Sequence, residues 1–276
     1  LAGNALDAAV VADIFAAKQR PTFDPLIVHT ARAAEAWSLA REIPPMAERL
    51  ADAFWPGPLT LVLPRQPGIP DLLSAGLDTL ALRVPAHPVS RALIREAGFP
   101  LAAPSANRFG RISPTRAEHV IEELSDAAQV AGVVDAGPCE RGVESTVVGF
   151  GEGGQVLVYR LGALPLEQVR DVVEEITVVT SPVESGSHSE RAPGMLKSHY
   201  APRTPMMLLE EGAPVPELNG CTGWLTLDRR VEQAGPAEHL SKSGDLSEAA
   251  SRLFACMRRL DDQNPDRIVA WKVPEE

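Results

Sequence analysis

The sequence predicts an α/β protein built on a mixed sheet, followed by a smaller α/β domain. Over residues 1–175, short apolar runs typical of buried strands alternate with segments of helical periodicity. The runs 143–150 and 155–159 flank the glycine-rich stretch 151–154, which predicts an antiparallel hairpin beside strands joined by helices. A Ser/Gly-rich stretch at 180–189 then separates this region from a second alternation of strands and a helix.

The first predicted elements are two helices separated by a strand. Asp7 can cap a helix whose apolar residues between Val10 and Phe15 fall on one face. The apolar run 26–29 predicts a short buried strand, and the alanine-rich run 30–42 predicts the second helix.

The middle of the sequence continues the alternation. Two prolines at 44–45 favour the first turn of a helix that ends at the Trp-Pro-Gly-Pro stretch 55–58. The runs 59–63 and 80–84 predict strands, and the pair of Thr115 and Glu118 forms a capping box ahead of another helix.

The second region is a small α/β unit. The runs 206–209, 224–227 and 268–271 predict strands, and 246–260 predicts a helix. The predicted division of the chain is a first domain at 1–176, a linker at 177–205 and a second domain at 206–276.

Composition and charge exclude several classes of protein. Lys and Arg total 26 against 37 Asp and Glu, and the formal charge of −11 argues against a polybasic nucleic-acid binder. Apolar residues make up 45%, which is enough for a sizeable core. No apolar run reaches the about eighteen residues that span a bilayer, and no signal-peptide pattern is present. We therefore expect a cytoplasmic protein with no membrane partner.

Metal and nucleotide signatures are also missing from the sequence. Cys139, Cys221 and Cys256 are far apart and form no CxxC pair, and the six histidines form no HExxH motif. A metal held by side-chain nitrogen and sulfur is not predicted. The sequence contains no P-loop, no GxGxxG after a strand and no GxSxG, so a bound nucleotide would need another device for its phosphates.

Two groups of polar residues suit an anionic ligand. Lys18 and Arg20, two positions apart, would face one side of an extended stretch, although the pair taken alone favours an ordinary charged helix C-terminus. Ser105 and Asn107 follow a strand-like run and would share one face, with Ser113 opening the next helix. An ordinary turn with local hydrogen bonds is the alternative for the second group.

Further candidates are single polar residues within or beside apolar strands. Arg83 lies in an apolar strand and needs a counter-charge, which a structural ion pair or a carboxylate substrate could supply. Ser145 opens a strand with two hydroxyl residues. His29 and Arg160 lie near strand ends, where ligands bind, but surface positions explain them as well.

Four motifs in this order closely resemble the threonylcarbamoyl-AMP synthases of the YrdC-like family, in the longer form with a second domain. They are Lys18-Gln-Arg20, Ser105-Ala-Asn107 followed by Ser113-Pro-Thr115, Ser145-Thr-Val147, and Ser198-His-Tyr-Ala-Pro202 in the linker. The resemblance covers nearly the whole chain, and its KxR and SxN pairing is the most specific part.

The resemblance implies a twisted α/β sheet around a basic cavity and a smaller Rossmann-like C-terminal domain. It implies synthesis of L-threonylcarbamoyl-AMP from L-threonine, bicarbonate and ATP, with Mg²⁺ accompanying ATP and pyrophosphate released. Transferase partners would then pass the threonylcarbamoyl group to adenosine 37 of tRNA. Such chemistry needs positioning and cationic stabilisation rather than a covalent nucleophile, and a lid over the labile product.

The resemblance also implies roles for individual residues. Lys18, Ser105 and Asn107 would contact the phosphates of ATP. Ser113 and Arg160 would help to hold the nucleotide, and Tyr200 would close over it from the linker. The residues expected to bind threonine are Arg20, His29, Arg83 and Ser145. Lys18 and Arg20 are the residues expected to act in catalysis.

The sequence departs from the family pattern at both ends, where we expect truncation. Family members carry a Pro-Thr-x-Thr-x-Tyr-Gly-Leu stretch, and this chain begins at the position of its final Leu. Two alternatives stay open: an RNA-binding module without catalysis, and a carbamoyl-transfer accessory domain of the hydrogenase-maturation type. The zinc-finger cysteines and acylphosphatase-like segment expected of the latter are missing from the sequence.

Overall fold

The computed structural model describes residues 1–179, 200–210, 213–228 and 234–273. They form two compact units that interleave in the sequence. Segments 110–119 and 137–143 are grouped with the C-terminal residues rather than with the first unit. The domain boundaries expected from the sequence stay a prediction, and residues 180–199 of the expected linker lie outside the described residues.

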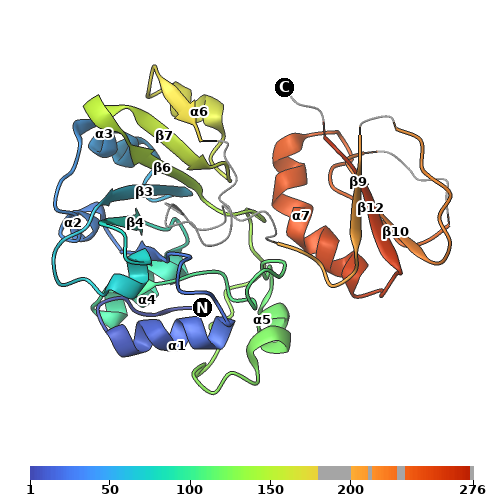
Figure 1. Cartoon of the computed structure of the whole chain (residues 1–276), viewed down its shortest axis with the longest axis horizontal. Helices are drawn as coiled ribbons and strands as arrows, with labels where there is room; N and C mark the ends of the chain where they lie inside the picture. Colours follow the sequence, from blue (N-terminus) through green and yellow to red (C-terminus); the bar gives the residue numbers. More distant parts are fainter. Residues whose placement is uncertain (180–199, 211–212, 229–233, 274–276) are drawn as a thin grey trace. The chain divides into compact units, whose positions relative to one another are not determined.

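The first unit is built on a mixed sheet, as the sequence predicts. The described strands run in the order β1-β5-β2-β4-β3-β6-β7-β8, of which Figure 1 labels β4, β3, β6 and β7. The pairs β2–β4, β3–β6 and β7–β8 are parallel, whereas β3–β4 and the hairpin β6–β7 are antiparallel. The strand bounds are β1 Gly3–Asn4, β2 Ile27–His29, β3 Leu59–Pro64, β4 Thr79–Arg83, β5 Leu101–Ala102, β6 Thr146–Phe150, β7 Val156–Arg160 and β8 Ile176–Val178.

Helix α1 (Ala8–Lys18) has the start that its sequence predicts. The Asp7 carboxylate accepts from the backbone N–H groups of Ala9 and Val10, at 2.9 and 3.4 Å. The helix ends because Gln19 adopts the left-handed conformation, with φ of 53°. This reversal separates Lys18 from Arg20, so the two side chains leave a helix end rather than an extended stretch.

Helix α3 also follows its prediction, whereas helices α2, α4 and α5 differ more from the sequence predictions. Helix α2 is shorter than the expected 30–42 because Ala40 pairs with Arg65 in an isolated β-bridge. Helix α5 begins at Ala117, one residue later than a cap at Thr115 predicts, and the Thr115 N–H donates to His119 Nδ1. Helix α4 was not predicted, although Pro88 opens it. The bounds are α2 Ala33–Trp37, α3 Pro45–Phe54, α4 Pro88–Ala97, α5 Ala117–Leu124 and α6 Leu166–Arg170, with 3₁₀ turns at Asp71–Ser74 and Glu152–Gly154.

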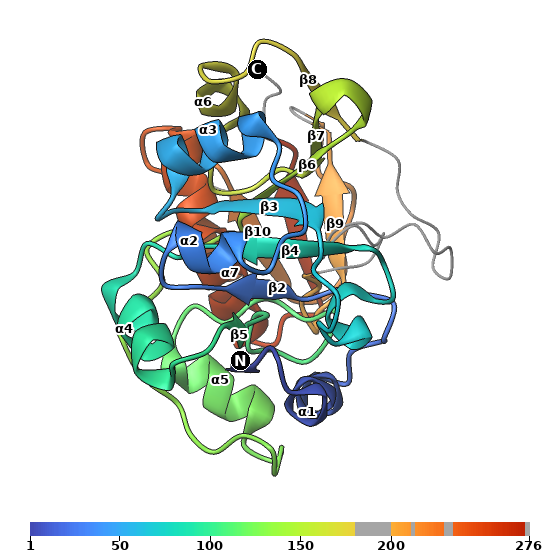
Figure 2. The ribbon, with the colours of Figure 1, turned by 90° about the vertical axis from the view of Figure 1, so that its left-hand side faces the viewer.

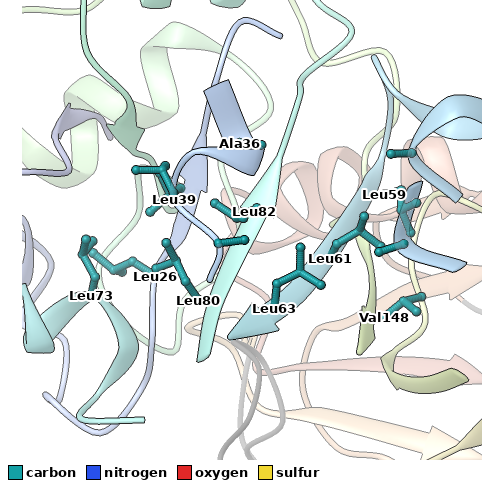
Figure 3. Close-up of a cluster of buried hydrophobic side chains, with 14 of the residues drawn as sticks. Leu26, Ala36, Leu39, Leu59, Leu61, Leu63, Leu73, Leu80, Leu82 and Val148 are labelled. Atoms are coloured by element: carbon teal, nitrogen blue, oxygen red, sulfur yellow. The ribbon is translucent and has the colours of Figure 1, made fainter. Parts of the chain in front are cut away.

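One face of the large sheet carries the main hydrophobic core (Figure 3). Leu59, Leu61 and Leu63 alternate along β3 and are fully buried. Because side chains alternate between the two faces of a strand, these leucines share the face that also holds Leu82 and Val148 of the neighbouring strands. Burying each such side chain stabilises the fold by about 1.5–3 kcal/mol.

The second unit contains a parallel sheet of strands in the order β11-β10-β12-β9, packed with helix α7 (Leu246–Asp261). Asp245 caps this helix by accepting from the Glu248 N–H at 2.6 Å. Strand β11 was not predicted from the sequence. The strand bounds are β9 Met206–Leu209, β10 Thr222–Thr226, β11 Ala237–His239 and β12 Arg267–Trp271.

Candidate active site

Strand register brings predicted site residues into one row across the large sheet. His29 of β2 pairs with Arg83 of β4, and continuing the β3–β4 register places Thr60 opposite Arg83. Thr60 pairs in turn with Val147 of β6, which pairs with Arg160 of β7. Register partners direct their side chains to the same face. The polar row, His29–Arg83–Thr60–Arg160, therefore lies on the face opposite the leucine core (Figure 2 shows β2, β4 and β3 side by side).

A β-bulge decides on which face Arg160 lies. Val148 pairs with Val158 and Val147 with Arg160, so that Tyr159 is the additional residue of the bulged strand. In a regular register Tyr159 would oppose Val147, and Arg160 would point toward the leucine core. The bulge turns the guanidinium to the face of the polar row instead. Strand periodicity alone could not have given this orientation.

Ser145 lies immediately before β6 and adds a hydroxyl to the polar row. It lies two positions before Val147 and shares its face. The Arg160 Nε and Nη2 groups donate to the Ser145 carbonyl oxygen at 3.0 and 2.9 Å, and Nη2 also donates to Ser145 Oγ at 3.1 Å. The Ser145 hydroxyl is 2.8 Å from that of Thr60. Arg160 thus holds Ser145 in place, and its expected contact with the nucleotide stays a prediction.

Lys18 is a buried cation tied to the segment that carries Ser105 and Asn107. Its Nζ donates to the backbone carbonyls of Ser105 and Asn107, at 2.5 and 2.7 Å. Burial, and then the positive charge of Arg20, lower the pKa of Lys18 to about 7, and Glu144 opposes this shift. The structure therefore brings three predicted phosphate-binding residues together around an amine that titrates near neutral pH.

Arg20 is held by its own loop. Its Nε and Nη2 donate to the carbonyls of Asp24 and Pro25 at 3.0 and 2.7 Å, and Nη2 lies 2.8 Å from the Asp24 carboxylate. Its guanidinium also lies 5.9 Å from the centre of the Phe109 ring, within reach of a cation–π contact. Burial raises the pKa of Asp24, and the charges of Arg20 and Arg160 oppose that rise. Asp24 is thus a partner of Arg20 and lies within electrostatic range of Arg160.

Sequence reasoning missed Asp24, which carries a signal that could have been read. A carboxylate four residues after an arginine, in a short loop containing proline, is a candidate partner for that arginine. Thr60 was missed for a different reason, because a β-branched residue within an apolar strand is the most ordinary of patterns.

His29 is a neutral member of the polar row. Its ring lies next to Arg83, and burial together with that charge lowers the pKa of His29 to about 3. The Arg83 Nε donates to the Gly57 carbonyl at 3.0 Å, which fixes the side chain of the arginine. At physiological pH the row thus presents guanidinium groups, hydroxyls and an uncharged imidazole, a set that suits a carboxylate and polar groups of a small ligand.

Ser113 and Tyr200, which are predicted to bind the nucleotide, belong to the second unit. The Ser113 carbonyl accepts from Arg258 Nε at 3.2 Å, and the Tyr200 ring packs against Phe254 with ring centres 5.2 Å apart. Tyr200 has a φ of 61°, in the left-handed region that residues other than glycine seldom adopt. Their expected contacts with ATP stay predictions.

Neither a protein-held metal centre nor a membrane span is found in the part of the chain that the structure describes. No group of three or more His, Cys, Asp or Glu residues there could hold a metal ion. None of the described helices is long and apolar enough to cross a bilayer.

Comparison with known proteins gives matches over the whole length of the chain. The family model described as Telomere recombination matches residues 1–162, and that of the threonylcarbamoyl-AMP synthase C-terminal domain matches residues 164–276. The threonylcarbamoyl-AMP synthase of Pyrococcus abyssi is 39% identical, over 100% of this chain and 83% of that protein. The Bacillus subtilis protein of the same name is 38% identical, over 100% of this chain and 82% of its own length.

Solved structures give the same result. A crystal structure of Pyrococcus abyssi Sua5 complexed with L-threonine superposes with a TM-score of 0.88 at 36% identity, covering 100% of this chain and 82% of that one. Both parts of the chain are matched by family models, and the relatives are covered over most of their length. The chain belongs to the threonylcarbamoyl-AMP synthase family.

Proposed function

We propose that this protein synthesises L-threonylcarbamoyl-AMP from L-threonine, bicarbonate and ATP, with release of pyrophosphate. The product would serve the threonylcarbamoyl modification of adenosine 37 in tRNA. The observation that carries the proposal is the joint presence, in one unit, of the polar row and of buried Lys18 on the Ser105–Asn107 segment. One group suits an amino acid and the other suits phosphates.

The proposed chemistry joins two steps. The threonine amine combines with the carbon of bicarbonate or CO₂ to give a carbamate, with loss of water or a proton. A carbamate oxygen then attacks the α-phosphorus of ATP, and the bond to the bridging oxygen breaks as pyrophosphate leaves. Negative charge accumulates on phosphate oxygens, where Lys18 would stabilise it without becoming covalently attached. Arg83 would hold the threonine carboxylate, because a guanidinium matches a carboxylate in two contacts.

Mg²⁺ fits this proposal as a companion of ATP. Its preferred ligands are oxygens, and it commonly reaches a site on substrate phosphates with one or two carboxylates. When bound, the ion would supply charge neutralisation of the phosphates. The charges of Glu144, Asp24 and Glu123 act on Lys18, and that of Glu144 acts most strongly, so Glu144 is the carboxylate that we propose would assist.

We also propose that the linker limits hydrolysis of the product. Tyr200 would place its ring over the nucleotide, so Tyr200→Ala should yield less intact adenylate per pyrophosphate released. Because Tyr200 also packs on Phe254, the Phe254→Ala variant is the control for general loosening of the second unit. An unchanged ratio of adenylate to pyrophosphate in Tyr200→Ala would rule this role out.

Downstream partners and location follow from the proposed product. A reactive mixed anhydride must reach its acceptor quickly, so we propose that transferase proteins acting on tRNA receive it in the cytoplasm. Direct binding of tRNA by this chain is not required.

The decisive experiment measures pyrophosphate release with each substrate left out in turn. We expect release from ATP only when both L-threonine and bicarbonate are present, and threonylcarbamoyl-AMP as the product by mass spectrometry. Release that persists without threonine would contradict the proposal and would indicate a general nucleotide hydrolase. Binding of RNA without any adenylate formation would instead favour an RNA-binding module.

A further inference from the structure

Thr60 is a buried hydroxyl at the centre of the polar row that the proposed chemistry does not use. Its side chain is 0% exposed, and that of its neighbour Ser145 is 2% exposed. It lies between two parts of the site, because Arg83 is its partner on β4 and Val147 its partner on β6. The Thr60 and Ser145 hydroxyl oxygens are 2.8 Å apart, a normal distance for an O–H···O hydrogen bond.

Counting donors and acceptors gives the direction of this bond when a ligand acceptor is present. Each hydroxyl has one proton and two lone pairs. Ser145 Oγ already accepts a hydrogen from Arg160 Nη2, at 3.1 Å. If Ser145 donated to Thr60, the Thr60 proton would have no acceptor among the described residues, since Ser145 is the hydrogen-bond partner found for that hydroxyl. If Thr60 donates, the proton without a protein acceptor is instead that of Ser145, and an acceptor atom of a bound ligand can satisfy it. Because a buried donor without an acceptor costs about 1–3 kcal/mol, the arrangement in which Thr60 donates is favoured when such a ligand is bound.

With Thr60 as the donor, Ser145 can form only one further hydrogen bond, and only by donating its proton. Both of its lone pairs are used, one by Arg160 and one by Thr60, and its own proton is available. A hydroxyl in this state donates and accepts nothing more. Its partner must therefore be an acceptor, such as a carboxylate oxygen, rather than an ammonium or amide N–H.

We infer that Thr60 is a positioning residue, which orients the Ser145 hydroxyl as a hydrogen-bond donor to the carboxylate of the bound amino acid. This inference rests on the proposed function, in which Ser145 contacts threonine. Thr60 does not itself touch the substrate. It acts by fixing which atom of Ser145 donates and in which direction.

The test compares threonine binding in the full chain and its Thr60 and Ser145 variants, by calorimetry without ATP. Thr60→Val keeps the shape of the side chain and removes the hydroxyl, and it should weaken threonine binding about 10-fold. ATP affinity should stay within about two-fold, and Thr60→Ser should restore threonine binding because it restores the donor. In the Ser145→Ala background, Thr60→Val should add no further loss.

Thr222→Val is the matched control, because Thr222 is a buried strand threonine of the second unit. It reports what the loss of one buried hydroxyl does to the melting temperature without touching the polar row. A Thr60→Val protein that loses threonine and ATP affinity equally, in step with a lowered melting temperature, would reduce Thr60 to a structural residue and overturn the inference.

Two further outcomes separate this inference from the proposed function. If Ser145→Ala weakens threonine binding but Thr60→Val does not, Thr60 plays no positioning role, and the proposed function stands. If Ser145→Ala binds threonine as the wild type does, Ser145 is not a threonine contact and the inference falls with it. The threonine dependence of pyrophosphate release then still decides the proposed function independently.

Discussion

The two faces of the large sheet contrast in how they use the same strands. Along β3, Leu59, Leu61 and Leu63 enter the main core, whereas Thr60 and Val62 belong to the opposite face. The core face is held by apolar burial, which is non-directional and tolerates exchange of similar side chains. The opposite face carries the polar row and only a small apolar cluster.

The contrast between the two faces shows how the cationic side chains of the site are held in fixed positions without a surrounding apolar core. The site cations are tied to backbone carbonyls: Arg83 to Gly57, Arg20 to Asp24 and Pro25, and Lys18 to Ser105 and Asn107. A carbonyl offers partial negative charge without a full opposing charge, and of these three cations Arg20 also pairs with a carboxylate, that of Asp24. The cations therefore keep their attraction for anionic substrates while their positions are set in advance.

The largest expected effect lies on the core face. Leu61→Ala should lower the free energy of unfolding by about 3 kcal/mol, because it removes a fully buried side chain and leaves a cavity. Threonine KM should stay at the wild-type value in the folded fraction. Chemical denaturation and steady-state kinetics measure the two quantities, and Leu93→Ala, exposed at 42%, is the control with little effect on stability. A raised threonine KM in folded Leu61→Ala would contradict the prediction that the core face affects stability without affecting threonine binding.

The second prediction concerns the polar face. Arg83→Lys should raise the threonine KM roughly 30-fold, equivalent to about 2 kcal/mol, because an ammonium cannot make the paired contact of a guanidinium with a carboxylate. Stability and ATP affinity should change little. Arg41→Lys is the matched control, since Arg41 pairs with Asp78 on the surface. Unchanged kinetics would mean that Arg83 does not bind the threonine carboxylate and that its hydrogen bond to Gly57 has only a structural role.

The smallest expected effect is a change in bound protons. With a pKa of about 7, Lys18 is mostly neutral at pH 8 in the free protein and would become charged beside phosphates. ATP binding should therefore take up close to one proton at pH 8 and much less at pH 6. Calorimetry in buffers of different ionisation enthalpy gives this number. Lys18→Arg, which keeps the charge but does not titrate, should lose the uptake. Equal uptake in both proteins would contradict the burial-lowered pKa.

Much of the fold could be predicted from local sequence signals. The capped helix α1, the proline-initiated helix α3 and the hairpin around the glycines at 151–154 are confirmed, because caps and turns act within a few residues. Helix α2 was predicted too long, since its C-terminal end is set by the bridge from Ala40 to the distant Arg65. Helix propensity does not contain that contact.

The candidate site divides in a similar way. Motif spacing identified Lys18, Ser105 and Asn107, and the structure brings them together. It missed Asp24, whose spacing from Arg20 was a readable signal, and it could not identify Thr60, whose importance lies in the partner that it meets. Thr60 and Ser145 are 85 positions apart in sequence, and only the pairing of β3 with β6 makes them neighbours.

The sequence by itself determined the mixed α/β class, because this depends on local periodicity, and its motifs carried the resemblance to the family and indicated most residues of the candidate site. Tertiary structure alone decided which of these residues share a face. The bulge at Tyr159 turns Arg160 to the polar row, and strand register aligns His29, Arg83 and Thr60 with it. The physical reason is that a shift of one residue in register moves a side chain to the opposite face, and register is set by packing between strands distant in sequence.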